Sequence, residues 1–192
     1  MARLTEVARL AGEAVLPDAA QCPSAPSMRF ICLLLLACTS VVTALIELQD
    51  APLDGACNYG GDGGAWGLFS EQGAPNRAYY GMRAFAALLA TPQRVRLTGT
   101  EPGRFAAWAG VNKDGTSAAC LLSTFAGSVS EVVVQLGNLP WSGATQLEIR
   151  MVDAKNAFTK VREETLPASP EQLRLSLPAP AVGLVVLRPV GR

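Results

Sequence analysis

The chain contains no histidine, and this absence excludes several kinds of catalytic chemistry. Ser-His-Asp and Cys-His catalysis both use an imidazole as the general base, so neither is available. A zinc site is disfavoured as well, because imidazole is one of the main zinc ligands. Any acid–base step therefore has to use Asp, Glu, Lys, Tyr or Cys, and we predict no metal site and no cofactor.

An excess of charge of one sign is also missing, because 16 basic and 16 acidic side chains cancel. A balanced chain offers no basic surface of the kind that attracts nucleic acid, so no nucleic-acid partner is predicted. Charged residues make up only 17% of the chain and hydrophobic residues 49%, which is ample for a core. A length of 192 residues fits one large domain or two small ones.

The sequence lacks a Cys-x-x-Cys pair, and its number of cysteines, five, is odd. Three of them fall in or beside hydrophobic segments, where a buried free thiol is the commoner state. We therefore expect structural burial rather than a disulfide framework or a redox role. The five cysteines are Cys22, Cys32, Cys38, Cys57 and Cys120.

Residues 51–89 predict a short strand, a glycine-rich loop and an amphipathic helix. The strand is expected over residues 53–59, and the loop 60–64 has four glycines, which disfavour regular structure and let a ligand approach the backbone. Asn76 is the predicted N-cap of the helix, which ends before Thr91-Pro92. Its apolar residues recur at three- and four-residue steps: Ala78, Gly81, Met82, Phe85, Leu88 and Leu89.

The same segment resembles the end of the catalytic barrel in family 39-like, β-xylosidase-like glycoside hydrolases of clan A. In that family the last barrel strand ends in an Asn-Tyr or Tyr-Tyr pair. A Gly/Asp loop, a Gly-Leu-Phe segment, a Gly-x-Pro turn and a Tyr-Tyr-x-x-(Arg/Lys)-Ala-Phe helix follow it. In this sequence the same order is formed by Asn58-Tyr59, residues 60–64, Gly67-Leu68-Phe69, Gly73-Ala74-Pro75 and residues 79–85.

The resemblance implies a sugar pocket and therefore a carbohydrate ligand. Asn58, Tyr59, Asp62 and Trp66 lie where an intact enzyme of the family would line this pocket. Aromatic faces stack on the C–H surfaces of sugars, and Asn or Asp side chains pair with sugar hydroxyls. Each of the four residues also has a structural interpretation, as a packing residue or as part of a turn.

The resemblance also implies that most of the active site is missing. Retaining glycosidases need two carboxyl groups about 5–5.5 Å apart. The family places its acid/base glutamate in an Asn-Glu pair, and no Asn-Glu occurs in this sequence. Glu6 is the candidate nucleophile, although Val7 replaces the family's tryptophan and Glu6 also fits a solvated position at a helix start. We expect a C-terminal glycosidase fragment that cannot hydrolyse O-glycosidic bonds alone, with the missing barrel half as a possible partner.

Residues 30–46 form an uninterrupted uncharged run that has three interpretations. The run mimics a signal peptide beginning at Met28, and residues 35–38 resemble a lipoprotein box. As a membrane span it is at the short end of the roughly 17–25 residues that a bilayer needs. In the resembled family a helix outside the barrel sits here and leads into a Leu-Gln-Asp-Ala-Pro segment, which residues 48–52 match. We favour this barrel helix. A membrane partner follows only if the run is a signal or anchor, and the compartment stays open between cytoplasmic and secreted.

After Pro92 the hydrophobic pattern alternates, as in half-buried strands. Turn signals such as Asp114-Gly115 separate the strands at short spacing, which favours an antiparallel sandwich. Trp108 and Trp141 are expected to pack in the core or at a domain interface rather than against a sugar. The predicted strands cover residues 93–97, 104–111, 117–123, 129–136, 145–153, 158–166, 173–177 and 184–188.

The predicted fold is mixed α and β, with a remnant of the end of a (β/α)8 barrel followed by an antiparallel β-sandwich. Residues 1–27 are expected to be poorly organised and could also be a mis-started or frame-shifted reading. Residues 28–92 would be the last helix–strand–helix part of the TIM-barrel catalytic domain, and residues 93–192 the sandwich. The alternative function is an exported or lipid-anchored β-sandwich module that binds carbohydrate, with Trp66, Trp108 or Trp141 as its contacts.

Overall fold

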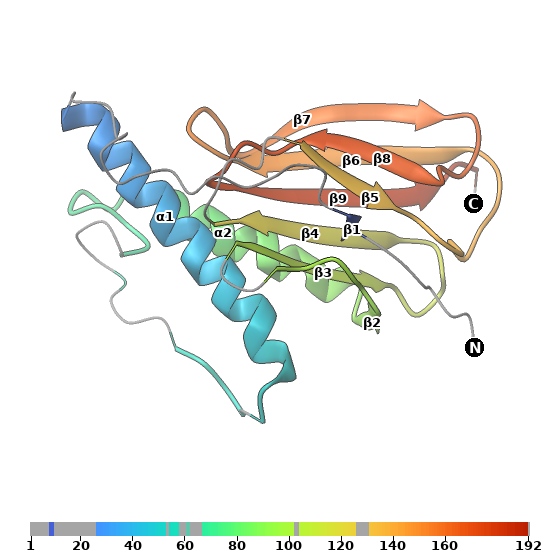
Figure 1. The fold of residues 1–192 in the computed structure, drawn as a ribbon, viewed down its shortest axis with the longest axis horizontal. Helices are drawn as coiled ribbons and strands as arrows, with labels where there is room; N and C mark the ends of the chain where they lie inside the picture. Colours follow the sequence, from blue (N-terminus) through green and yellow to red (C-terminus); the bar gives the residue numbers. More distant parts are fainter. Residues whose placement is uncertain are drawn as a thin grey trace.

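The described part of the chain contains two α-helices and two antiparallel sheets, and most of the strands follow the helices (Figure 1). The first helix, α1 (Pro26–Glu47), continues into the 3-10 turn η2 (Leu48–Asp50), and the second, α2 (Arg77–Ala86), into η3 (Ala87–Ala90). The computed structural model describes residues 8–9, 26–52, 54–57, 61, 67–101, 104–125 and 131–191.

The strands form two sheets. The larger has six strands in the order β2-β3-β4-β9-β6-β7, and the smaller has three in the order β1-β5-β8. All of the paired strands run antiparallel. The strands are β1 (Ala8–Arg9), β2 (Gln93–Val95), β3 (Phe105–Val111), β4 (Ala118–Thr124), β5 (Glu131–Gln135), β6 (Thr145–Val152), β7 (Ala157–Leu166), β8 (Gln172–Ser176) and β9 (Ala181–Pro189).

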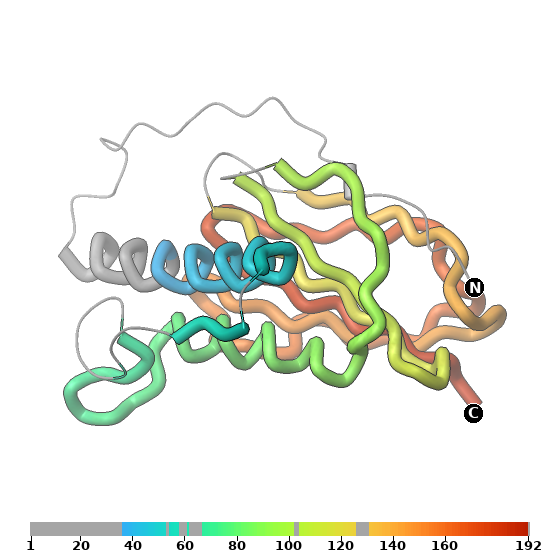
Figure 2. The backbone as a smooth tube through the Cα atoms, turned by 90° about the horizontal axis from the view of Figure 1, so that it is seen from below, coloured from blue at the N-terminus to red at the C-terminus, as the bar shows by residue number. Residues whose placement is uncertain are grey.

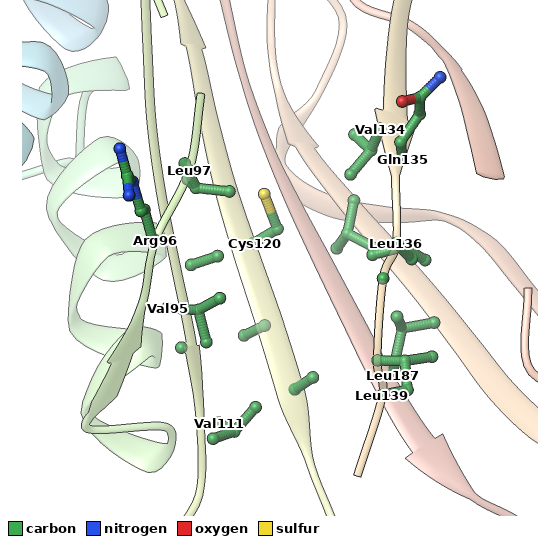
Figure 3. Close-up of a pocket in the computed structure, with 16 residues that line it drawn as sticks. Val95, Arg96, Leu97, Val111, Cys120, Val134, Gln135, Leu136, Leu139 and Leu187 are labelled. Atoms are coloured by element: carbon green, nitrogen blue, oxygen red, sulfur yellow. The ribbon is translucent and has the colours of Figure 1, made fainter. Parts of the chain in front are cut away.

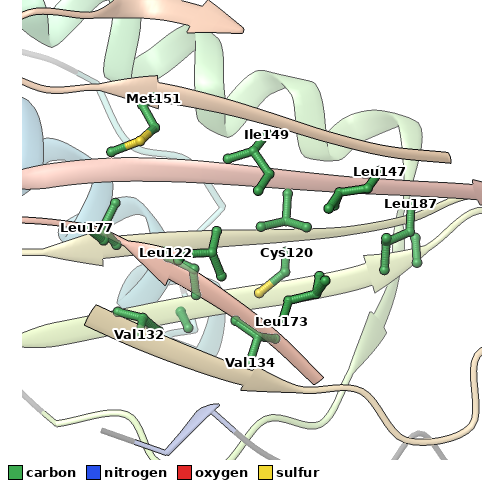
Figure 4. Close-up of a cluster of buried hydrophobic side chains, with 14 of the residues drawn as sticks. Cys120, Leu122, Val132, Val134, Leu147, Ile149, Met151, Leu173, Leu177 and Leu187 are labelled. Carbon is green, nitrogen blue, oxygen red and sulfur yellow. The ribbon is translucent and has the colours of Figure 1, made fainter. Parts of the chain in front are cut away.

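One hydrophobic core lies between the two sheets (Figure 4). Val132 and Val134 of β5 and Leu173 of β8 face the larger sheet, which contributes Leu122 and Ile149. The alternation expected from the sequence produces this core, because every second residue of β6 and β8 is buried while its neighbours reach the surface. The eight predicted strands and the antiparallel sandwich are confirmed.

A second core lies between the helices and the outer face of the larger sheet (Figures 1 and 2). Cys38, Val42 and Ile46 of α1 pack with Ala84 of α2 and with Trp108 of β3. The prediction that residues 30–46 form a helix continuing to Asp50 is confirmed, and this helix lies against α2. Among the residues that are described, no helix is long and apolar enough to span a membrane.

The crossing of the two helices depends on Gly81. A Cβ atom at this position would lie 2.8 Å from the Sγ of Cys38 and 3.0 Å from a methyl carbon of Val42. Only a residue without a side chain therefore allows α2 to approach α1 this closely.

Two local expectations are wrong. Residues 54–57 of the predicted 53–59 strand are exposed and form no strand, while 53, 58 and 59 lie outside the described residues. This short polar segment has low strand propensity, and the described structure gives it no neighbouring strand to pair with. Leu89, expected on the apolar face of the helix, is 78% exposed. The helix tightens to three residues per turn in η3, which buries Leu88 and turns Leu89 outward.

Candidate functional site

Asn76 connects the residues that follow the glycine-rich loop to the first turn of α2. Its Oδ1 accepts hydrogen bonds from the backbone N–H groups of Ala78 (2.9 Å) and Tyr79 (3.4 Å), which confirms the predicted N-cap of α2. Its Nδ2 donates to the carbonyl oxygen of Gly67, and its backbone N–H donates to that of Leu68 (3.0 Å). One side chain therefore fastens Gly67 to the start of α2.

A tight turn brings the chain back to Asn76. The backbone N–H of Gly73 donates to the Ser70 carbonyl (2.9 Å), and that of Ser70 donates to the Ala74 carbonyl (2.8 Å). Gly73 has a φ of 77°, which glycine adopts without strain. On the other side, the N–H of Phe69 donates to the carbonyl of Gly61 (3.0 Å). Gly61 and Gly67, the described residues on either side of positions 62–66, are thus both held by hydrogen bonds.

Arg77 ties this region to the sandwich. Its guanidinium donates to the carbonyl oxygens of Asn156 (3.1 Å) and Ala154 (3.2 Å), in the turn between β6 and β7. Asp153 shapes this turn by accepting the N–H groups of Lys155 (2.7 Å) and Asn156 (2.8 Å). The first residue of α2 is therefore fixed to a hairpin that lies far away in the sequence.

Aromatic side chains pack together beside the first turn of α2. The ring of Phe69 lies 5.3 Å from that of Tyr79, centroid to centroid, and Tyr79 lies edge-on to Tyr80 at 5.4 Å. Both distances fall within the range of favourable aromatic pairs. These contacts pack Phe69, which follows the glycine-rich loop, against the first turn of α2.

The predicted site residues themselves, Glu6, Asn58, Tyr59, Asp62 and Trp66, lie outside the described residues. The structure therefore leaves their proposed roles as predictions. Within the described parts of the chain, no group of three or more His, Cys, Asp or Glu residues is arranged to hold a metal ion.

The tryptophans of the sandwich are packing residues. Trp108 and Trp141 are each 8% exposed, the first on the helix side of the larger sheet and the second in the core between the sheets. The indole N–H of Trp141 donates to the hydroxyl oxygen of Thr145 (3.0 Å). The expectation of core or interface packing is confirmed for both residues, so neither offers a face to a sugar.

The two buried thiols, Cys38 and Cys120, are not prepared for nucleophilic chemistry. Cys38 and Cys120 are free and buried, as expected, whereas Cys57 is free and exposed. Burial raises the pKa of Cys38 and of Cys120 to about 12, because the thiolate would lose its hydration. Both groups therefore stay protonated at neutral pH.

Two hollows flank the edge strand β2. The first is an apolar slot of about 50 Å³ between the sheets, with Val95 and Leu97 on one wall, Val134 and Leu136 on the other, and Cys120 between them (Figure 3). The second is a polar groove of about 470 Å³. Among the described residues that line the two hollows, Asp50 is the single one with a carboxyl group. In this part of the chain neither hollow thus brings together the two carboxyl groups that a glycosidase uses.

Sequence reasoning missed the polar contacts that link the helices to the sandwich, and two of them are formed by arginines. The first joins Arg77 to the β6–β7 turn, and the second joins Arg94 of β2 to Asp50 of η2. The Arg94 hydrogen bond lowers the pKa of the Asp50 carboxyl below its usual value. No local pattern in the sequence signals either contact, because the partners are far apart along the chain.

The fold is shared with part of several solved glycoside hydrolases. A glucosidase from Croceicoccus marinus is matched with a TM-score of 0.72 and 18% identity, over 82% of this chain and 43% of that chain. A monomeric β-xylosidase from Caulobacter crescentus CB15 is matched with 0.60 and 15%, over 82% and 42%. A GH30 endoxylanase from Clostridium papyrosolvens C71 is matched with 0.58 and 12%, over 79% and 38%.

These matches show that the fold is shared. They show the fold alone, because every identity is below 20%. The chain spans about two fifths of the length of each of the three structures. Each match covers about four fifths of this chain, whereas the segment from β2 to β9 is only about half of it. Each match therefore also includes residues that precede β2. No protein-family model and no curated protein matches the sequence.

Proposed function

We propose that the chain is the C-terminal part of a β-xylosidase-like glycoside hydrolase that acts on O-glycosidic bonds, and that it is inactive alone. The observation that carries this proposal is the match to the glucosidase, which spans most of this chain but less than half of that enzyme. A fold shared by a glucosidase, a β-xylosidase and an endoxylanase supports glycoside hydrolysis as the reaction of the whole protein.

The order of motifs supports the same proposal independently of the fold comparison. The sequence from Asn58-Tyr59 through the Gly/Asp loop to the Tyr79-Tyr80 helix follows the order found at the end of a family 39-like barrel. Residues 28–92 then correspond to the last part of a catalytic barrel, and residues 93–192 to the sandwich that follows it. Catalytic groups of such barrels lie at the carboxyl ends of the strands.

Within this proposal, Asn58, Tyr59, Asp62 and Trp66 line the sugar pocket. The described contacts at Gly61, Gly67 and Asn76 hold the positions that flank the last two of these residues. Tyr59 and Trp66 would stack on sugar rings, and Asn58 and Asp62 would pair with hydroxyl groups. Substrate recognition would therefore come in part from this chain.

The chemical step needs groups from elsewhere. Hydrolysis with retention requires a nucleophilic carboxylate and an acid/base carboxyl group on opposite sides of the glycosidic bond. The chain has no Asn-Glu pair to supply the acid/base glutamate, and Glu6 is its one candidate nucleophile. The missing barrel half would have to provide at least the acid/base group.

Activity of two purified chains tests the proposal. Residues 1–192 and a longer chain, extended upstream in its native genomic frame, would be assayed with 4-nitrophenyl β-xyloside and β-glucoside. We expect turnover by the longer chain only. Turnover by residues 1–192 would contradict inactivity alone, and no turnover by either chain would contradict the glycosidase assignment.

Variants of the active longer chain test the pocket. Trp66→Ala and Asp62→Asn are expected to reduce kcat/KM at least tenfold, whereas the nearby control Asp54→Asn leaves it unchanged. Equal activity of all three variants would remove Asp62 and Trp66 from the pocket.

The alternative function is a carbohydrate-binding module that is cleaved or lipid-anchored within residues 30–46. The described structure gives this alternative no specific support. That module would lose part of α1, yet Cys38 and Val42 are fully buried against α2 and the larger sheet. Two of its three candidate contacts, Trp108 and Trp141, are buried as well.

A further inference from the structure

The edge segment of residues 93–97 separates the two hollows described above. Val95 and Leu97 point into the apolar slot, and Arg96 points to the opposite side (Figure 3). Strand β2 pairs with β3 through Gln93, Arg94 and Val95, and the pairing stops there. Beyond this point the segment leaves β3, and the polar groove lies beside it, with Ala107 of β3 in its lining.

The polar groove has the volume of a small-molecule site. Its volume of about 470 Å³ lies within the range of about 300–1,000 Å³ that is usual for such sites. Arg94, Arg96, Asp50 and Thr100 supply its polar groups, and Val95, Leu97 and Ala107 supply apolar surface. A ligand that fills it would meet both guanidinium groups and an apolar wall.

The two arginines of the groove differ in their partners. Arg94 binds both carboxylate oxygens of Asp50, with 2.9 Å between its Nη2 and Oδ2 and a second contact from Nη1 to Oδ1. Arg96 is exposed and makes no hydrogen bond or ion pair with any residue that the structure describes. The groove therefore holds one neutralised guanidinium beside one that is not neutralised.

The backbone of Arg96 is nevertheless held in place. Its neighbours Val95 and Leu97 are both partly buried, and their side chains lie in the slot between the sheets. A guanidinium presents its N–H donors in a planar fork that matches a carboxylate through two parallel hydrogen bonds. An anchored arginine with a free fork at the wall of a ligand-sized groove is suited to bind such a group.

We propose that this groove binds the carboxylate of a small molecule, with Arg96 as its bidentate partner and the Thr100 hydroxyl beside it. Asp50 occupies Arg94 and repels a second carboxylate, so it limits the affinity of the site. The carboxylate can come from a simple organic acid or from an acidic sugar, whose hydroxyl groups would add bonds to Thr100 and Asp50.

Titration of the ¹⁵N-labelled 192-residue chain by NMR tests the proposal. Sodium acetate, sodium galacturonate and galactose would be added at constant ionic strength, adjusted with sodium chloride. We expect saturable shifts of the Arg96 and Thr100 amide signals with the two carboxylates and none with galactose. Tighter binding of galacturonate than of acetate would identify an acidic sugar as the ligand class, and equal binding would identify a simple carboxylate.

Three variants separate the roles of the charged groups. Arg96→Gln is expected to weaken carboxylate binding about tenfold, the order expected for the loss of a charge-assisted hydrogen bond. Arg174→Gln is the matched control, because Arg174 is an exposed arginine on the smaller sheet. Asp50→Asn is expected to strengthen acetate binding, since it releases Arg94 and removes the repelling charge.

The proposal fails if no carboxylate gives saturable shifts at residues 96 and 100. It fails equally if Arg96→Gln binds as the unchanged protein does, or if Arg96→Gln and Arg174→Gln weaken binding to the same extent. A dispersed amide spectrum for each variant establishes that its fold is intact before affinities are compared.

Discussion

The two faces of the six-stranded sheet differ in what they pack against, although both are buried. Leu121 and Leu122 are consecutive residues of β4 and both are fully buried. Leu122 faces the smaller sheet, while Leu121 faces the helices. Because side chains of a strand alternate between its faces, one strand serves both cores.

The face toward the smaller sheet is filled mainly by apolar side chains of both sheets, and the Trp141–Thr145 hydrogen bond lies at this core. The face toward the helices contains a chain of polar contacts between α1 and β4. The hydroxyl of Thr43 donates to Ser123 Oγ (3.0 Å), and the hydroxyl of Ser123 donates to the carbonyl of Thr39 (3.3 Å). Gly81 adds a close crossing of α1 and α2. Both cores are therefore apolar, and the outer one also requires α2 to approach the side chains of Cys38 and Val42 closely at Gly81.

The largest effect is expected from a loss of volume on the inner face. Leu122→Ala should lower the free energy of unfolding by about 2–5 kcal/mol, because it removes buried methyl groups and leaves a cavity. Urea unfolding measures this change, and hydrogen exchange locates it. We expect Leu122→Ala to reduce protection throughout both sheets, and Leu121→Ala to reduce it first in α1 and α2. A uniform loss after Leu121→Ala would contradict the division into two cores.

A smaller effect is expected from added volume on the outer face. Gly81→Ala should destabilise the protein by about 1–3 kcal/mol, since its Cβ would collide with Cys38 and Val42. Gly55→Ala is the control, because no atom lies within 4 Å of the added methyl group. Cys38→Ala should restore part of the stability of Gly81→Ala in urea unfolding. Absence of rescue would place the strain at the backbone of α1 rather than at the thiol.

The smallest effect concerns charge on the outer face of β6. Partial burial raises the pKa of Glu148, but hydrogen bonding with Arg150 and the nearby charges of Arg188 and Lys160 outweigh it and lower the pKa below 4.5. A lowered folded-state pKa contributes stability above pH 4.5, and this contribution disappears as the pH falls further.

Glu148→Gln should therefore flatten the acid limb of the stability curve below pH 4.5 and lower stability slightly at pH 7. Thermal unfolding between pH 3 and 7 measures both changes. Glu131→Gln is the control, because Glu131 forms a more exposed ion pair with Arg174. Parallel curves for the native protein and Glu148→Gln would contradict the assigned ion pair.

The sandwich could be predicted from the sequence because its signals are local. Leu147, Ile149 and Met151 alternate with polar residues and are buried as expected. Gly115 has the positive φ of 65° that a tight hairpin turn favours, and Asn76 caps α2 as expected. Each of these features depends on residues within a few positions of one another.

The expected strand at 53–59 shows the limit of such signals. Whether a segment forms a strand depends on a neighbour that supplies hydrogen-bond partners, and no described strand lies beside residues 54–57. Leu89 shows a second limit. A regular helical period places it with Leu88, but the change to a 3-10 turn separates the two residues.

The sequence by itself determined the class of fold, because alternation, turn residues and caps act over short stretches of chain. It also determined the lack of imidazole chemistry and the order of motifs that resembles a glycosidase barrel end. Only the tertiary structure decided which groups meet over long separations. Arg77 reaches Asn156 across 79 positions, Thr43 reaches Ser123 across 80, and Arg94 reaches Asp50 across 44. The physical reason is that these pairs gain their energy only after both cores have formed and brought the partners within hydrogen-bond distance.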